Sequence, residues 1–330
     1  MRDAILELPT ETPRPGLNPS LRVSIILGGL ILLASLPLFR PPLFFLSLLI
    51  SIFLFVSLTE SWNLMGGYAG YISLGHVVFF SIGAYTTAVG MKVFGASPFL
   101  TAVPGGIIAG AVAAVVGYPV LRLKGAYFSI SSLLMAVICQ LIFLNWDFVG
   151  GSTGLWYKLM PVTIETNRAV FYEVMLGIAL LTTLAVRHVE RSKFGAGLVT
   201  LREDEDVART IGINTAWLKL KAFVLGSFFA GLAGGIYGYY LSFIQPDITF
   251  NINTSLLILM MAFFGGCMTW IGPLLGAVIL SVANQLIVTF IGAEISRILY
   301  GLVLILVMIF MPNGIVEFLR TRKSSRGKNA

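Results

Sequence analysis

The sequence predicts an all-α integral membrane protein, a polytopic helical bundle of about eight to ten transmembrane spans with glycine-interrupted helices. Three observations lead to this fold class. Of the 330 residues, 57% are hydrophobic and 11% are charged, whereas roughly a quarter of the residues in a soluble domain are charged. The mean hydropathy is +0.91. The apolar residues also gather in long continuous runs, close to the ~20 residues that a helix needs to cross ~30 Å of hydrocarbon.

Ten apolar runs follow one another along the chain, each of 15 residues or more. They cover residues 23–39, 42–59, 71–91, 99–121, 126–146, 169–186, 222–243, 254–270, 273–291 and 297–311. Lipid offers the backbone no hydrogen-bond partner, so each run is expected to be helical. Continuous rather than alternating hydrophobicity argues against a β-barrel. The shorter runs can be tilted or re-entrant, which leaves the number of full spans open by about two.

The charges divide the chain and orient it. Residues 1–22 are rich in proline and predict a disordered cytoplasmic leader, residues 23–311 form the transmembrane domain, and residues 312–330 form a basic tail. Most of the 22 lysines and arginines lie on the side that holds both termini and the long polar segment 187–221. The positive-inside rule therefore places all three in the cytoplasm. Topology explains the net charge of +7, so we expect contact with membrane lipid and no nucleic-acid partner.

Several functional groups are missing from the sequence. No Asp, Glu, Lys or Arg lies deep in the runs, and Glu60 and Glu173 are expected near their ends. An ion-coupled carrier usually needs such a buried group. No GxxxxGK[ST] motif is present to bind ATP phosphates. The two cysteines lie in separate apolar runs and the two histidines lie far apart, so we expect no metal site and no cofactor.

One glycine pair lies between two of the runs and another lies inside a run. The pairs Gly66-Gly67 and Gly265-Gly266 can serve close helix packing, or they can break helices at membrane depth, as in transport sites. The two halves of the chain would have opposite topology, as an inverted repeat requires, but the breaks do not fall at corresponding spans. His76 is either a packing residue or part of a polar cavity with Ser73. The candidates for the translocation path are Gly70, Ser73, His76, Gly265 and Gly266.

Six segments in order resemble one known family. They read GYAGYISLGHVVFFSIGAY (67–85), KGAYFSISSL (124–133), GGSTGL (150–155), REDEDVARTIGINTAWLKLKAF (202–223), AGLAGGIYGYYLSFIQPD (230–247) and FFGGCMTWIGPLLGAVI (263–279). Over residues 45–320 the chain resembles the branched-chain amino acid ABC transporter permeases of the LivM type. The resemblance implies a permease subunit in the cell inner membrane that transports branched-chain or related amino acids and is not itself an enzyme. It also implies three kinds of partner: a second permease subunit, two cytosolic ATP-binding subunits and an extracytoplasmic substrate-binding protein.

The same resemblance identifies segment 187–221 as the cytoplasmic ATPase-coupling loop. The family's motif of the EAA---G type falls on Asp206, Val207 and Ala208, followed by Gly212, with Asp in place of Glu and Val in place of one Ala. The expected coupling residues are Glu203, Asp204, Glu205, Asp206, Val207, Ala208 and Gly212. The acidic run suits a helix N-terminus, where it can also be a solvated cap, and Gly212 suits a helix end.

Two departures leave the substrate open. Tyr71 stands where family members often carry Gln, and Thr153 where they often carry an acidic residue. The substrate can therefore be a related compound, such as urea or a short amide. Two readings from other classes remain: a stand-alone channel or ion-coupled carrier, and a membrane assembly protein. The coupling loop argues against the first, and the glycine-broken spans argue against the second.

Overall fold

The structure is a computed structural model that describes residues 28–157, 162–290, 301–302, 305 and 314–316. Eight helices in these parts of the chain are long and apolar enough to cross a membrane. The regular elements in the described residues are helices and one short antiparallel pair of strands, β1 (Leu155–Trp156) and β2 (Phe243–Ile244). The predicted all-α polytopic fold is therefore confirmed.

The helix bounds follow the apolar runs with shifts at the ends. The long helices are α2 (Leu43–Asn63), α3 (Val77–Phe94), α4 (Pro98–Val120), α5 (Ala126–Leu144), α6 (Ile164–Glu190), α9 (Thr215–Leu241), α11 (Ile252–Gly265) and α12 (Ile271–Phe290). The short elements are η1 (Leu36–Phe39), a π-turn η2 (Leu64–Tyr68), η3 (Asp147–Val149), η4 (Gly151–Thr153), α7 (Lys193–Glu203), α8 (Glu205–Thr210) and α10 (Pro246–Thr249). The run predicted at 23–39 is described only as the short helix Gly28–Phe39. Most of 297–311, the leader and nearly all of the tail lie outside the described residues.

The boundary between the second and third predicted runs was wrong. The helix expected to end at residue 59 continues through η2 to Tyr68, and the next helix begins at Val77 rather than at residue 71. Residues 69–76 between them are irregular. Gly70 has φ +75°, a left-handed conformation that a helix does not contain and that glycine adopts without strain. Hydrophobicity alone could not locate this interruption because the residues on both sides of it are apolar.

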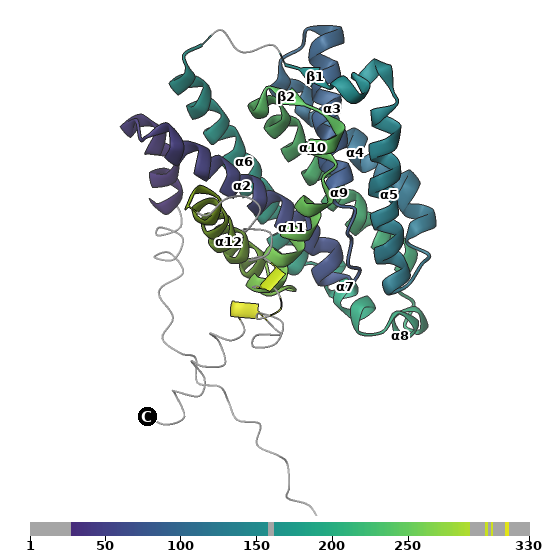
Figure 1. Cartoon of the computed structure of the whole chain (residues 1–330). Coiled ribbons are helices and arrows are strands. Elements are labelled where there is room, and N and C mark those ends of the chain that lie inside the picture. The colour runs from purple at the N-terminus through teal and green to yellow at the C-terminus, as the bar shows by residue number, and fades with distance from the viewer. Residues whose placement is uncertain (1–27, 158–161, 291–300, 303–304, 306–313, 317–330) are drawn as a thin grey trace, which may run out of the picture. The chain divides into compact units, whose positions relative to one another are not determined.

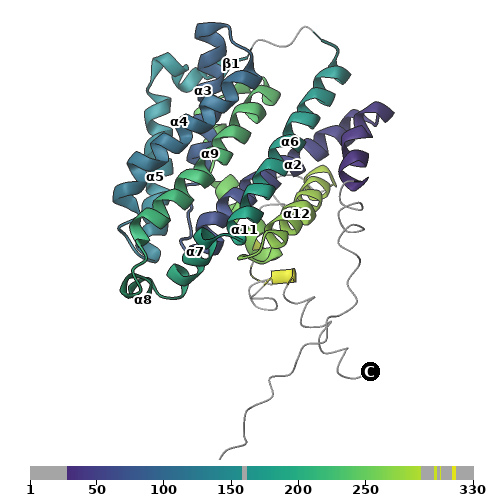
Figure 2. The ribbon, with the colours of Figure 1, turned by 180° about the vertical axis from the view of Figure 1, so that it is seen from behind.

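Close packing through glycine holds the bundle together around α9. A Cβ at Gly83 of α3 would collide with the carbonyl oxygen of Gly231 in α9, and one at Gly234 would collide with that of Phe80. These small residues let α3 and α9 approach nearly backbone to backbone, as in other membrane helix pairs. The strands β1 and β2 lie at one end of the bundle, and α7 and α8 lie at the other (Figures 1 and 2).

Candidate functional site

The irregular segment 69–76 is held by side chains from several helices. Ser129 of α5 donates to the carbonyl oxygen of Ile72 at 2.7 Å, and Leu74 N donates to Ser132 Oγ of the same helix at 2.9 Å. Trp62 Nε1 donates to the Ser73 carbonyl oxygen at 2.8 Å. Backbone polar groups freed by the helix break are thus satisfied inside protein, which is the condition for irregular backbone at membrane depth.

The second glycine break lies beside the first. Helix α11 ends at Gly265, and Gly266 has φ +105°. Asn63 Nδ2 donates to the Thr269 carbonyl oxygen at 3.1 Å, and a Cβ at Gly67 would lie 3.2 Å from Met268 N. The two glycine pairs, some 200 residues apart in sequence, therefore lie close together in space.

Ser73 and His76, the polar candidates for the translocation path, are buried. They are 1% and 4% exposed. His76 Nε2 is hydrogen-bonded to Ser61 Oγ at 2.9 Å. In this conformation His76 is therefore a packing residue whose Nε2 has a hydrogen-bond partner. Ser73 Oγ has no hydrogen-bond partner among the residues that the structure describes. The place of both side chains on the translocation path stays a prediction.

Glu60 corrects the expectation that no carboxylate lies deep in a span. Because α2 and η2 continue to Tyr68, Glu60 lies within the 26-residue span Leu43–Tyr68 rather than near its end. It is fully buried, and both of its carboxyl oxygens lack a hydrogen-bond partner within the described part of the chain. The absence of a buried carboxylate is therefore no longer an argument against an ion-coupled carrier.

The predicted coupling segment forms the short helix α8. Asp204 caps it: its Oδ1 accepts from the N–H groups of Asp206 at 2.8 Å and Val207 at 3.0 Å, and these bonds lower the pKa of Asp204. Gly212 follows the helix with φ +84°, the left-handed conformation expected at a C-terminus. Glu203, grouped in the prediction with this helix start, instead ends α7.

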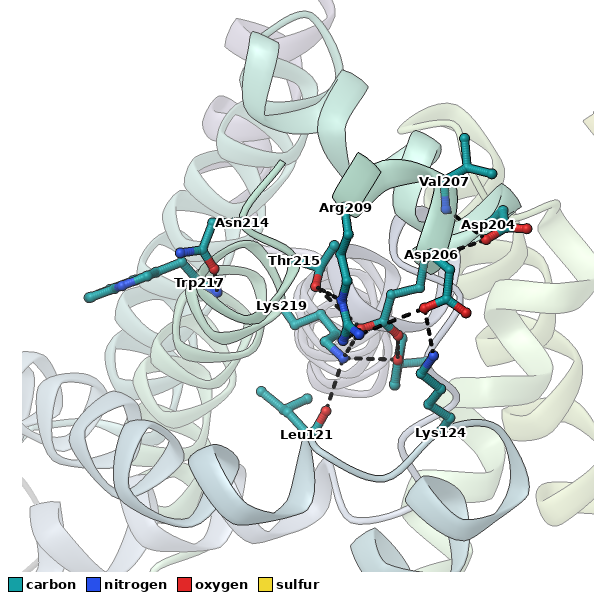
Figure 3. A network of polar contacts seen from close by, with 12 residues as sticks. Leu121, Lys124, Asp204, Asp206, Val207, Arg209, Asn214, Thr215, Trp217 and Lys219 are labelled. Carbon is teal, nitrogen blue, oxygen red and sulfur yellow. Dashed lines mark hydrogen bonds and ion pairs between the residues drawn. The ribbon is translucent and has the colours of Figure 1, made fainter. Parts of the chain in front are cut away.

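Glu205 is buried rather than a solvated cap. Its Oε2 accepts from the Tyr71 hydroxyl at 2.6 Å, and its Oε1 accepts from Lys219 Nζ at 2.9 Å and Arg209 at 2.6 Å (Figure 3). Lys219 also donates to the carbonyl oxygen of Leu121 at 3.0 Å. This buried network joins α8, the start of α9, the end of α4 and the irregular segment 69–76.

Electrostatics keep Glu205 charged. Burial alone would raise its pKa, but hydrogen bonds from Tyr71 and Lys219 and the charges of Lys219 and Arg209 outweigh burial and lower the pKa of Glu205 from 4.5 to about 2. The side chains of Glu205 and Lys219 are 8% and 4% exposed. Sequence reasoning missed Lys219 as a functional residue. The available signal was a lysine at the edge of an apolar helix. Its partner Glu205 lies on the other side of a turn, and the sequence does not show how that turn directs the two side chains.

Arg202 makes a second link between the loop 187–221 and the helix break. Its guanidinium donates to the carbonyl oxygen of Gly67 at 2.6 Å. Its stem passes so close to Gly70 that a Cβ there would lie 2.8 Å from Arg202 Cγ. Segment 67–71 is therefore held from the side of the loop 187–221 by Arg202 and Glu205, which belong to the neighbouring short helices α7 and α8.

The two faces of α8 differ. Glu205 and Ala208 point inward, and Ala208 is fully buried. The Val207 side chain and the neighbouring Ile211 are 53% and 65% exposed, and the side chain of Asp206 is 75% exposed. The Arg209 side chain is 53% exposed as well, so the surface that α8 offers outward combines apolar side chains with charges of both signs.

The two departures from the family pattern have local roles. Tyr71 is part of the Glu205 network and stacks edge-on against Phe128, with ring centroids 5.2 Å apart. Thr153 donates to the Gly150 carbonyl oxygen at 2.7 Å in an exposed turn next to β1. In this conformation Tyr71 is bound in the network. Thr153 lies in the turn directly before β1, and β1 lies at the opposite end of the bundle from α8 (Figure 1).

Comparison with known proteins identifies the family. The sequence model of the branched-chain amino acid transport system permease components matches residues 43–308. The chain is 28% identical over 306 residues to the high-affinity branched-chain amino acid transport system permease protein LivM of Salmonella typhimurium. The aligned region covers 83% of this chain and 71% of the relative. It is 29% identical over 172 residues to LivH of the same organism, covering 52% of this chain and 53% of the relative.

An archaeal relative, the probable LivM permease of Methanocaldococcus jannaschii, is 24% identical over 220 residues, or 62% of this chain and 64% of the relative. No solved structure matches the chain significantly. The family match spans both glycine breaks, the Glu205 network and α8. The chain therefore belongs to the family of branched-chain amino acid transport permease components, as a multi-pass transport subunit rather than an enzyme.

Proposed function

We propose that this chain is one of two permease subunits of an ABC importer in the cell inner membrane, and that the importer carries branched-chain or related amino acids. Two cytosolic ATP-binding subunits would drive it, and an extracytoplasmic binding protein would deliver the substrate. Both termini and the α7–α8 segment would be cytoplasmic. Transport by alternating access requires no catalytic side chain in this chain.

The construction of α8 carries the proposal. The helix is capped at both ends, anchored by the buried Glu205–Lys219 pair, and exposes Val207 and Ile211. A short rigid helix with an exposed apolar ridge is suited to insert into a groove on a partner. Ala208 is fully buried, so its role in this proposal is to seat α8 on the bundle, while Val207 contacts the ATPase.

This assignment predicts that Val207→Asp abolishes coupling without loss of the fold. A carboxylate buried unpaired at an interface costs ~2–5 kcal/mol, so ATPase binding should weaken by about 30-fold or more. Copurification of the ATP-binding subunits and uptake in membrane vesicles are the measurements. The control is Val93→Asp, because Val93 is 52% exposed in the last turn of α3, away from α8. Normal ATPase recruitment by Val207→Asp would rule out α8 as the docking helix.

A further inference from the structure

Helix α5 has the most exposed face among the candidate spans. Only 22% of the residues in its apolar stretch are buried, the smallest share of the eight. In both views α5 lies at the margin of the bundle (Figures 1 and 2). Its large exposed side chains follow helical spacing: Tyr127, Ile130, Leu134, Ile138, Leu141 and Ile142. This set is called the α5 outer face.

Lipid is a poor cover for the whole of this face. Near its β1–β2 end, Gln140 Nε2 of α5 donates to Asp247 Oδ1 of α10 at 2.9 Å, and this pair is exposed. Gln140 lies about one turn inside the end of α5, and Asp247 is the second residue of the candidate span Pro246–Gly265, at the edge of the apolar region. A carboxylate facing hydrocarbon is costly, whereas one facing protein or a water-filled path is typical of transport proteins.

The inner side of α5 is bound to the helix break. Ser129 and Ser132 hold the Ile72 carbonyl oxygen and Leu74 N, and the fully buried Phe128 packs against Tyr71. Tyr71 in turn donates to Glu205 of α8. A single helix thus has the α8-linked segment on one side and an uncovered apolar face on the other.

We propose that the second permease subunit packs against the α5 outer face, with Gln140 and Asp247 at the extracytoplasmic edge of the path between the two subunits. The proposal rests on the proposed importer function. Its occupant follows from the comparisons: the chain is similar to both LivM and LivH permeases, so a partner of the same family would present a related helix face. Two related subunits meeting about a pseudo-two-fold axis pack equivalent surfaces together.

Helix α4 provides a matched control surface. Ile107 is as exposed as the residues of the α5 outer face. It borders a groove of about 850 Å³ between α4 and α9, in whose lining Lys221 is the one charged residue among those that the structure describes. A groove of this kind suits lipid acyl chains, and no carboxylate is found among the described residues that line it.

Photocrosslinking in the intact complex tests the proposal. A photoreactive phenylalanine analogue is placed at Leu134 or Leu141, and at Ile107 or Val115 as controls, in chains coexpressed with the second permease and the ATPases. All four positions are exposed. We expect a covalent product with the second permease from the α5 positions and none from the α4 positions. Ile138→Trp should reduce copurification of the second permease, while Ile107→Trp should leave it unchanged.

Three results would overturn the proposal: products from α4 but not α5, adducts with lipid alone from α5 in a complex that still copurifies, or products joining two copies of this chain. If the proposed importer function itself is wrong, the experiment gives a different result. In that case the unmodified chain would not copurify with a second permease or with ATPases, whatever the crosslinks show.

Discussion

At the scale of single residues, the carboxylate of Glu205 determines how α8 is held. Burying two opposite charges costs desolvation free energy, unless hydrogen bonds satisfy the remaining polar atoms of both groups. Here Tyr71, Lys219, Arg209 and Thr215 all contact the carboxylate, and Lys219 has a further acceptor in Leu121. The pair is therefore satisfied as a unit, and the removal of one member leaves the other buried and uncompensated.

Lys219→Met should destabilise the protein strongly. Breaking a buried pair from one side costs ~3–5 kcal/mol, whereas the exposed pair Lys124–Asp206, at 3.3 Å, should contribute less than ~1 kcal/mol. Lys124→Met is thus the matched control. Thermal unfolding of the protein in nanodiscs should show a large drop in Tm for Lys219→Met and a small one for Lys124→Met. The double variant Glu205→Gln/Lys219→Met should recover part of the loss, and equal drops for the two single variants would contradict the buried network.

The pH dependence follows from the lowered pKa of Glu205. Its folded-state value of about 2 is below the ordinary 4.5, so the stabilisation is fully present above pH 4.5 and is lost as pH falls toward 2. The Tm of the unaltered chain should therefore decrease with acidification over this range more steeply than that of Glu205→Gln. Parallel pH profiles would mean that Glu205 does not supply this stabilisation.

At the scale of elements, segment 67–76 is the place where the α7–α8 loop meets the bundle. Arg202 and Glu205 hold it from one side, while Ser129 and Ser132 of α5 hold it from the other. Helix elements are stiff, and an irregular segment between them can take up a change in their relative position. Movement of α8 would therefore reach α5 through this segment.

Loss of the Arg202 link should separate ATP hydrolysis from uptake. Arg202→Met keeps the aliphatic stem beside Gly70 but removes the donor to Gly67, so ATPases should still copurify while uptake per ATP hydrolysed falls several-fold. Tyr71→Phe removes the bond to Glu205 and keeps the ring contact with Phe128, and should act in the same direction. Arg202→Lys, which restores a donor, is the control. If uptake per ATP is unchanged in both variants, the segment does not transmit movement.

At the scale of the whole molecule, the bundle has two different ends. The α4–α5 turn, α7 and α8 gather at one end, where Lys124 contacts Asp206 and Lys219 contacts Leu121. The turn containing Thr153 and the β1–β2 pair lie at the other. Segments that charge counting assigned to the same side are thus brought together in space.

Surface labelling checks the proposed orientation. In a background with Cys139 and Cys267 replaced by serine, an impermeant thiol reagent added outside should label Thr153→Cys and spare Thr210→Cys. Both positions are exposed, so accessibility within the fold does not bias the comparison. Permeabilised cells should label both. Outside labelling of Thr210→Cys would place α8 on the wrong side of the membrane for contact with cytosolic ATPases.

The sequence by itself determined the class of protein, the approximate spans and the short helix in the long polar segment. Continuous apolar runs must form helices in lipid, because the backbone there must satisfy its own hydrogen bonds. The Asp204 cap and the left-handed Gly212 were equally accessible, since caps depend on residues a few positions apart. The glycine pairs marked both interruptions, although not where each helix ends.

Only the tertiary structure decided which side chains meet. It paired Glu205 with Lys219 and Tyr71, placed Arg202 on Gly67, brought the two glycine breaks side by side, and put Glu60 inside a span. These contacts join residues tens to hundreds of positions apart, and they depend on how far each helix extends and how it is rotated. An apolar helix in lipid is hydrophobic on every side, so its sequence carries little periodic signal to indicate the face that it turns to its neighbours.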